Sequence, residues 1–270
     1  MNERRWKSVG MRRVVTGLAA ALGLALAVGC TRPPTEPSSV ATPTPMPVKP
    51  AIEAIIHPEQ ISAELDPVLA KASEDLGCPD GMAGIPAGSV DTKWTVTPGG
   101  DVADRGEARP VEAFCIDRYE YPNERMALPR AKVNYIEAVE LCRKAGKRLC
   151  REDEWELACA GPAARAYSYG VEKEPWRCNT DGVETGSDEF LAASGSHPGC
   201  RNAYGVYDLN GNLSEWVDKR VNGNGAVVRG GTMWRAEYGQ SCYSRHRHGT
   251  TERWVDDGFR CCADPPASEP

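Results

Sequence analysis

Aromatic residues and histidines are scarce in this chain, and basic side chains are outnumbered by acidic ones. Aromatics make up 7% of the sequence, with three Phe, and there are four His. The net charge of −6 argues against a nucleic-acid-binding protein, because such proteins need a basic surface. The chain is instead rich in residues that interrupt helices, with 27 Gly and 21 Pro, which favours a loop-rich fold over a helical bundle.

Long apolar runs are also rare, and the one that stands out covers residues 14–29. It is short for a membrane span but has the length of a signal-peptide core. Five basic side chains precede it: Arg4, Arg5, Lys7, Arg12 and Arg13. The run ends in Leu-Ala-Val-Gly before Cys30, which resembles the bacterial lipoprotein box. We therefore predict a signal peptide over 1–29 and a lipid on Cys30; an ordinary secretory signal with a chance cysteine is the alternative.

The segment after Cys30 has little capacity to bury apolar surface. Residues 31–50 contain seven prolines among Ser, Thr and Ala, which is typical of a semi-extended tether. Residues 51–76 are weakly helical, so 30–77 is expected to be tether and linker. Thr31 in place of Asp favours the outer membrane, by resemblance to proteobacterial sorting. The prediction is a protein held in the bacterial cell envelope by a lipid anchor, with the membrane as one partner.

Eleven cysteines are present, and ten remain when Cys30 is set aside. An even number of cysteines in an exported chain indicates a disulfide framework. No C-x-x-C pair occurs, so a structural zinc site is the weaker interpretation. Ten cysteines allow hundreds of full pairings, and counting alone does not choose among them.

Two helices and four strands are predicted from residue 78 onward. One helix covers 135–144, with Ala138, Val139 and Cys142 on one face, and ends at Gly146. The second covers 151–160, with an acidic first turn that suits the positive end of the helix dipole. The strands are expected near 82–86, 111–117, 226–230 and 258–262.

Short motifs in a fixed order carry a resemblance to a known family. They include Ile-Pro-Ala-Gly-Ser at 85–89, Phe-Cys-Ile-Asp-Arg-Tyr-Glu at 114–120, Gly-Lys-Arg-Leu at 146–149, Glu-Trp-Glu at 154–156, Tyr-Gly-Val-Tyr-Asp at 204–208, Gly-Asn at 211–212 with Glu-Trp at 215–216, Arg-Gly-Gly-Thr at 229–232 and Gly-Phe-Arg-Cys at 258–261. Together these resemble the sulfatase-modifying-factor family, which has the formylglycine-generating-enzyme fold. The resemblance implies an α+β, C-type-lectin-like domain over 78–265, loop-rich, low in regular secondary structure and stabilised by disulfides. A short tail, 266–270, follows it.

The resemblance also implies disulfide partners. Family members with disulfides pair the cysteines of the helices with the C-terminal segment, and the remaining cysteines are paired to fit. The expected pairs are Cys142 with Cys261, Cys159 with Cys242, Cys78 with Cys115, Cys178 with Cys200, and Cys150 with Cys262. The partners of the neighbours Cys261 and Cys262 could be exchanged.

Formylglycine-generating enzymes of this family bind copper(I) through two cysteines, since soft thiolates suit that ion. In the family these cysteines lie in the stretch that corresponds to 233–245. Here that stretch holds only Cys242, whose distance from Gly258 matches the family's structural cysteine. We therefore expect no copper site.

Calcium is the metal that the resemblance favours. The family's Gly-Asn-x-x-Glu-Trp turn binds calcium, which prefers hard oxygen ligands. The corresponding residues are Asn210, Gly211, Leu213 and Glu215. A second family site begins at Asn179 and Thr180, with its other ligands expected within 186–190.

Two further groups are singled out by the resemblance. The family's peptide cleft corresponds to Trp234, Arg235, Tyr238, Tyr243 and Arg245, a mixture that suits a protein, peptide or glycan partner. Internal salt bridges are the expectation for Arg118, Glu120, Arg148, Glu154 and Arg260.

The resulting hypothesis is an envelope lipoprotein whose formylglycine-generating-enzyme-like domain is non-catalytic and acts as a binding or structural module. The alternative is a divergent formylglycine-generating, sulfatase-activating oxidase or a related metal-dependent oxidase.

Overall fold

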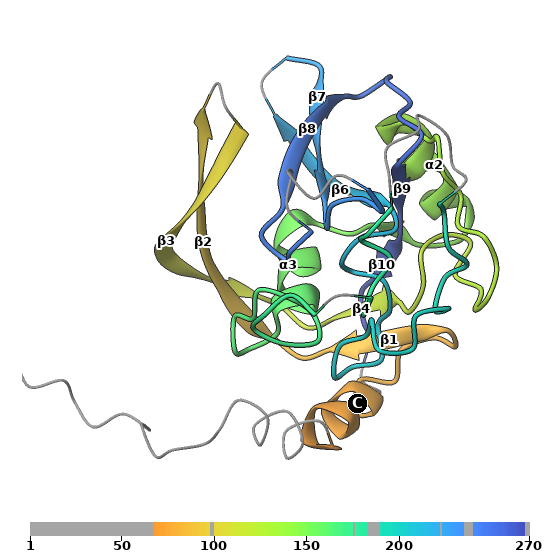
Figure 1. Ribbon diagram of the computed structural model, residues 1–270. Coiled ribbons are helices and arrows are strands. Elements are labelled where there is room, and N and C mark those ends of the chain that lie inside the picture. The colour runs from red at the N-terminus through yellow and green to blue at the C-terminus, as the bar shows by residue number, and fades with distance from the viewer. Residues whose placement is uncertain are drawn as a thin grey trace, which may run out of the picture. The chain divides into compact units, whose positions relative to one another are not determined.

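The structure is a computed structural model that describes residues 67–97, 100–174, 176–182, 190–221, 223–234 and 240–267 (Figure 1). The chain divides into two units, Met1–Ala51 and Ile52–Pro270, and all described residues belong to the second. The predicted signal peptide, Cys30, the tether and most of the linker lie outside the described residues. Within the described part, no helix has the length and hydropathy needed to cross a membrane.

The first sheet is assembled from four short strands that lie far apart in the sequence. Its order is β1-β4-β10-β5, and every neighbouring pair is antiparallel. The strands are β1 (Met82–Ile85), β4 (Phe114–Asp117), β10 (Cys261–Ala263) and β5 (Arg148–Leu149). The C-terminal strand is therefore an inner strand, and the sheet is incomplete without it.

The second sheet also has four strands, in the order β8-β7-β6-β9. They are β8 (Arg245–Gly249), β7 (Gly225–Arg229), β6 (Ser214–Val221) and β9 (Asp257–Phe259). β6 pairs with β9 in parallel, whereas the other pairs are antiparallel. Arg260 separates β9 from β10, so the single strand predicted near 258–262 is two strands in different sheets.

A long hairpin, β2 (Gly88–Thr97) and β3 (Gly100–Val111), stands at one side of the two sheets (yellow in Figure 1). It was not predicted from the sequence. The strand predicted over 111–117 is also wrong in part, since β3 ends at Val111 and β4 begins at Phe114.

The two predicted helices are present as α2 (Tyr135–Lys144) and α3 (Glu152–Ala160). α2 begins at Asn134, whose side-chain oxygen accepts the backbone N–H of Glu137 at 2.9 Å, a typical N-cap. Ala138 and Cys142 are buried, one helical turn apart. Val139 is 37% exposed, so its place on the apolar face was wrong: it lies about 100° around the helix from Ala138.

A further helical segment, residues 67–74, precedes β1 (orange in Figure 1). Leu69 packs against the hydrophobic core, and a Cβ at Gly84 would lie 2.4 Å from the carbonyl oxygen of Ser73. Glycine at 84 thus allows the segment to approach β1 closely.

Two hydrophobic clusters form the core. One includes Phe114, Trp155 and Val227, and the other includes Tyr135, Trp216 and Phe259. Disulfide cysteines belong to both clusters. Regular structure is sparse, so these covalent links stabilise a domain with few long elements.

Candidate functional site

All ten cysteines from Cys78 to Cys262 are in disulfides. The pairs are Cys78–Cys115, Cys142–Cys261, Cys150–Cys262, Cys159–Cys242 and Cys178–Cys200, the five that the resemblance implied. Cys242, the cysteine of the 233–245 stretch, is therefore bonded to α3 through Cys159. The part of the chain that the structure describes contains no free thiol that could act as a copper(I) ligand.

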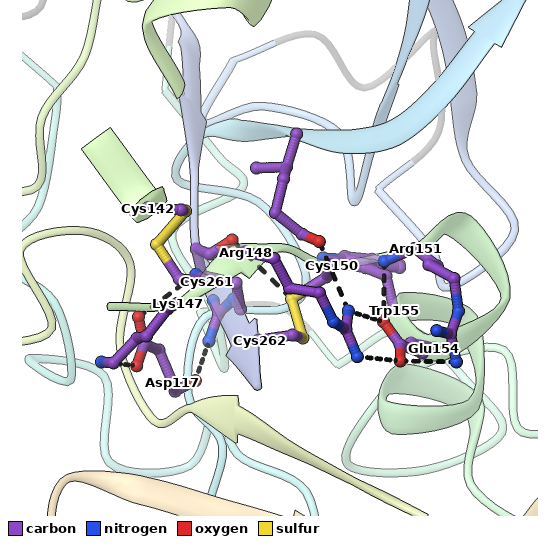
Figure 2. The surroundings of a disulfide bond; sticks show 12 residues. Asp117, Cys142, Lys147, Arg148, Cys150, Arg151, Glu154, Trp155, Cys261 and Cys262 are labelled. Carbon is purple, nitrogen blue, oxygen red and sulfur yellow. Dashed lines mark hydrogen bonds and ion pairs between the residues drawn. A yellow bond between two sulfur atoms is a disulfide. The ribbon is translucent and has the colours of Figure 1, made fainter. Parts of the chain in front are cut away.

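A network of charged side chains surrounds the adjacent disulfides of Cys261 and Cys262 (Figure 2). Figure 2 shows Glu154 between the guanidinium groups of Arg148 and Arg151. Arg148 donates to both oxygens of Glu154 at 2.7 Å, and Arg151 Nη2 lies 2.8 Å from Oε1. Glu154 is fully buried, so this pairing stabilises a charge that would otherwise be costly. The prediction of an internal salt bridge is confirmed for Arg148 and Glu154.

Arg118 and Glu120, by contrast, form no ion pair with any residue that the structure describes. Arg118 Nη1 donates to the carbonyl oxygen of Tyr204 at 2.9 Å. Glu120 accepts hydrogen bonds from Ser194 Oγ, Asn212 Nδ2 and the backbone N–H of Leu213. For these two residues the salt-bridge expectation is corrected to hydrogen bonding.

Of the expected cleft residues that the structure describes, two are buried. Arg245 is 6% exposed, and its Nε donates to Glu152 at 2.5 Å, so its charge is neutralised inside the protein. Trp234 is also 6% exposed, and its indole N–H has no hydrogen-bond partner among the described residues. Tyr243 is half-buried and donates its hydroxyl to the carbonyl oxygen of Ala164. Arg235 and Tyr238 lie outside the described residues. Burial therefore corrects the cleft assignment for Trp234 and Arg245.

The predicted calcium turn contains a carboxylate that already has strong partners. Arg260 donates to Glu215 through Nε at 2.7 Å and Nη2 at 2.6 Å, and Trp155 Nε1 donates to Oε2 at 2.7 Å. A guanidinium at this distance repels a cation, so the donor set does not fit calcium at Glu215 in this arrangement. Within the described residues, no group of three or more His, Cys, Asp or Glu could hold a metal ion.

The other members of that turn are also engaged in the fold. Asn210 Oδ1 accepts the backbone N–H of Ser168 at 2.9 Å, and the N–H of Gly211 bonds to the carbonyl oxygen of Gly230. A Cβ at Gly211, where φ is +77°, would lie 2.3 Å from the carbonyl oxygen of Asn179. Only glycine fits there, because both the positive φ and the close approach exclude a side chain. Leu213 is buried in the turn.

Two more carboxylates lie close to the Glu215–Arg260 pair. Burial, reinforced by the charges of Asp208 and Glu215, raises the pKa of Glu120 well above its usual value. Burial raises the pKa of Asp208 to about 6, although the N–H of Gly195 and the charge of Arg260 lower it. Glu215 is the carboxylate ion-paired with Arg260, whereas Glu120 and Asp208 feel the charge of the guanidinium without contacting it, so their burial favours the protonated form.

At the second candidate calcium position, the carbonyl oxygens each have a lone pair left to bind a cation. The carbonyl oxygens of Asn179 and Thr180 each accept one hydrogen bond, from Asn212 N–H and Gln240 Nε2 respectively, both at 2.8 Å. The hydroxyl of Thr180 is buried without a hydrogen-bond partner. A carbonyl has two lone pairs, so these atoms fit calcium. Of the expected remaining ligands, 186–189 lie outside the described residues.

The architecture defines a class: a disulfide-linked α+β domain of short strands and long loops. Residues 93–265 match the model of the sulfatase-modifying factor enzyme 1-like domain, more than half of the chain. The chain belongs to this family. Sequence order, fold and disulfide pattern therefore agree with the resemblance that the short motifs carried.

Some relatives are named as formylglycine-generating enzymes, and others are named as inactive forms. The chain is 32% identical over 168 residues to the formylglycine-generating enzyme of Streptomyces coelicolor, covering 50% of this chain and 52% of that protein. It is 30% identical over 157 residues to the inactive C-alpha-formylglycine-generating enzyme 2 of Mus musculus, covering 52% of this chain and 50% of that protein. The mouse formylglycine-generating enzyme is 29% identical over 164 residues, with 50% of this chain and 44% of that enzyme covered. The chain thus spans about half the length of the curated relatives it matches.

Solved structures support the fold. PvdO from Pseudomonas aeruginosa superposes with a TM-score of 0.50 at 21% identity, covering 68% of this chain and 94% of PvdO. Variable protein 1 of Treponema denticola gives a TM-score of 0.55 at 18% identity, with 68% of this chain and 95% of that chain covered. At such identities the likeness concerns fold alone.

Proposed function

We propose that this chain is a non-catalytic, lipid-anchored member of its family that acts at the bacterial cell envelope as a binding or structural module. The observation that carries the proposal is the cysteine inventory. Copper(I) chemistry needs free thiolates, and each cysteine from Cys78 to Cys262 is held in a disulfide. A relative named as an inactive formylglycine-generating enzyme supports the existence of family members without the activity.

Lipidation of Cys30 would hold the domain at the outer membrane, with 31–77 as a spacer. The supporting observations are the basic and apolar segments before Cys30 and the seven prolines after it. A domain of this kind would meet a protein, peptide or glycan partner in the periplasm or at the surface. Calcium belongs to the proposal at Asn179 and Thr180, whose carbonyl oxygens would be two of its ligands.

The experiment that tests the non-catalytic assignment uses the purified, oxidised full chain. Free thiols are counted under denaturing conditions, copper(I) uptake is titrated, and a Cys-x-Pro-x-Arg peptide is assayed for aldehyde formation by mass spectrometry. We expect no thiol beyond Cys30, no tight copper binding and no aldehyde. Copper-dependent aldehyde formation would overturn the proposal and make a divergent sulfatase-activating oxidase the leading function.

The envelope assignment has its own test. The full chain and a Cys30→Ser variant are expressed in a Gram-negative host, and the fractions are separated by density. We expect the full chain in the outer membrane and the variant in the soluble or signal-retaining fraction. Equal distribution of the two proteins would exclude a lipid on Cys30.

A further inference from the structure

A cavity lined by three arginines lies on the domain, and none of its lining residues belongs to 233–245. Its volume is about 490 Å³, and the lining includes Arg165, Arg177 and Arg201 together with Ser168 and Tyr169. Pro67 and Ala70 of the N-terminal helical segment close another side. No Asp or Glu lines this cavity. Arg177 is paired with Glu174, so the positive charge available in the cavity comes from Arg165 and Arg201.

Two of these arginines are not used by the fold. Arg165 is half-buried and Arg201 exposed, and neither side chain has a hydrogen bond or ion pair with any described residue. Within the core of this domain, Arg229, Arg245 and Arg260 each have a carboxylate partner. Arg229, Arg245 and Arg260 therefore stabilise the fold through ion pairs, whereas Arg165 and Arg201 keep their N–H groups available to a ligand.

The third arginine is held in place at the wall. Arg177 donates its Nε to the carbonyl oxygen of Gly199 at 2.9 Å and its Nη1 to Glu174 at 2.8 Å, and it lies over the ring of Tyr169. Three contacts fix the plane of the guanidinium. Such a fixed group loses little entropy when it binds a ligand.

A buried hydroxyl completes the set of donors. Ser168 lines the cavity and is 3% exposed, yet its Oγ has no hydrogen-bond partner in the part of the chain that the structure describes. Its backbone N–H donates to Asn210 Oδ1, which anchors the residue to the turn after Leu209. An unpartnered buried hydroxyl is costly, and a ligand oxygen accepting from it would remove that cost.

We propose that this cavity is a binding site for a compact oxyanion, a phosphate or sulfate group carried on a small organic molecule. The oxyanion would accept hydrogen bonds from Arg165, Arg201 and Ser168, and Arg177, which is paired with Glu174, would form the wall beside them. Guanidinium groups match the geometry of tetrahedral oxyanions and form charge-assisted hydrogen bonds to them. The organic part would lie in the same cavity, against Pro67 and Pro198. The adjoining apolar recess, lined by Leu69 and Pro162, has a volume of about 20 Å³ and is too small for a ring.

This inference goes beyond the proposed function and does not rest on it. The oxidase test concerns the cysteines, and the anchor test concerns Cys30, whereas the cavity uses neither. If either earlier proposal fails its test, the oxyanion-site proposal is unaffected. If the oxyanion-site proposal fails, the two earlier proposals are unaffected.

Binding is tested by isothermal titration of the full chain with inorganic phosphate, inorganic sulfate, phenyl phosphate, phenyl sulfate and the neutral benzyl alcohol. We expect the phenyl esters to bind more tightly than the free ions, and benzyl alcohol not to bind. Tighter binding of phosphate than of sulfate, or of sulfate than of phosphate, identifies which oxyanion the site prefers. Affinity should fall as the salt concentration rises, because the site is cationic.

Variants locate the site. The double change Arg165→Gln with Arg201→Gln should weaken phenyl ester binding at least about tenfold, because two charge-assisted hydrogen bonds are lost. Ser168→Ala should weaken it less. The matched control is Arg109→Gln, an exposed arginine on β3 that does not line this cavity. Its affinity should equal that of the unchanged protein.

Three results would overturn the proposal. They are no heat of binding with any anionic probe at about 10 mM, unchanged affinity in the double variant, and an equal loss in Arg109→Gln. Thermal unfolding of each variant verifies that it is folded. If the double variant does not fold, the single change Arg201→Gln, at an exposed position, is measured in its place.

Discussion

Arg260 and Glu215 stand 45 positions apart in the sequence and meet in a bidentate ion pair that is shielded from solvent. Arg260 follows β9 and Glu215 lies on β6, so the pair joins two strands that are also neighbours in the second sheet. Arg260 Nη2 also donates to the carbonyl oxygen of Tyr207 at 2.8 Å. The pair therefore fixes the loop before Asp208 as well as the two strands.

Removing one member of this pair should destabilise the domain strongly. Glu215→Gln leaves a buried guanidinium without its counter-charge, and we expect a loss of about 3–5 kcal/mol in the free energy of unfolding, measured in urea. The control is Glu140→Gln, which breaks an exposed ion pair with Arg143 and should leave the unfolding midpoint unchanged. Equal midpoints for the two variants would contradict a structural role for the pair.

The buried carboxylates predict a dependence of stability on pH. The pKa of Asp208 is raised to about 6, so its folded value exceeds its unfolded value. Stability from this group is complete below pH 4 and is lost as the pH rises through 6, a contribution on the order of 2–3 kcal/mol.

Asp208→Asn tests this expectation. The amide oxygen can still accept from the N–H of Gly195, and Asn tolerates the positive φ of 58° at this position. We expect the variant to be more stable than the unchanged protein at pH 7 and to show a smaller fall as the pH rises from 4 to 7, because Glu120 keeps its raised pKa. A persisting fall of the same size would assign it to other groups.

Two disulfides close loops of different kinds. Cys178–Cys200 closes a loop of 22 residues, whereas Cys150–Cys262 spans 112 residues whose ends are already tied together by Cys142–Cys261. Loop-closure entropy therefore predicts a loss of about 3 kcal/mol for the double Ala variant of Cys178–Cys200 and no more than about 3 kcal/mol for that of Cys150–Cys262. Both pairs are buried, so the two variants are matched for lost packing. Urea unfolding measures both losses, and a much larger loss for Cys150–Cys262 would contradict the entropic account.

Calcium should act through one candidate position only. We expect added calcium to raise the melting temperature, because binding at Asn179 and Thr180 favours the folded state. Glu215→Gln should keep the same calcium-dependent rise, since that carboxylate is occupied by Arg260. If calcium gives no rise, the chain binds none. If Glu215→Gln loses the rise, the metal displaces Arg260.

Local features were predictable from the sequence and long-range ones were not. Both helices were located closely because capping, dipole and apolar periodicity act within a few residues. The β2–β3 hairpin was missed, although Val90, Thr92, Trp94 and Val96 alternate with polar residues before a Pro-Gly-Gly turn. That signal was available and would have identified the strands.

The remaining wrong predictions concern side chains whose exposure or contacts depend on tertiary packing. Trp234 and Arg245 have the composition of a binding surface, but their exposure depends on what packs over them. Arg118 resembled Arg148 and Arg260 in sequence, yet it hydrogen-bonds to carbonyl oxygens, and no carboxylate of the described residues is paired with it. The arginine cavity escaped prediction because its members come from three separated loops.

The pairing of the cysteines sets the order in which the chain can mature. Because the chain is synthesised from its N-terminus, Cys142, Cys150 and Cys159 become available before their partners Cys261, Cys262 and Cys242. An oxidase that joins cysteines as they arrive would link neighbours within the first group, and those bonds would be wrong. The domain therefore requires either delayed oxidation or an isomerase, and its yield in a host should depend on disulfide shuffling more than on the rate of synthesis.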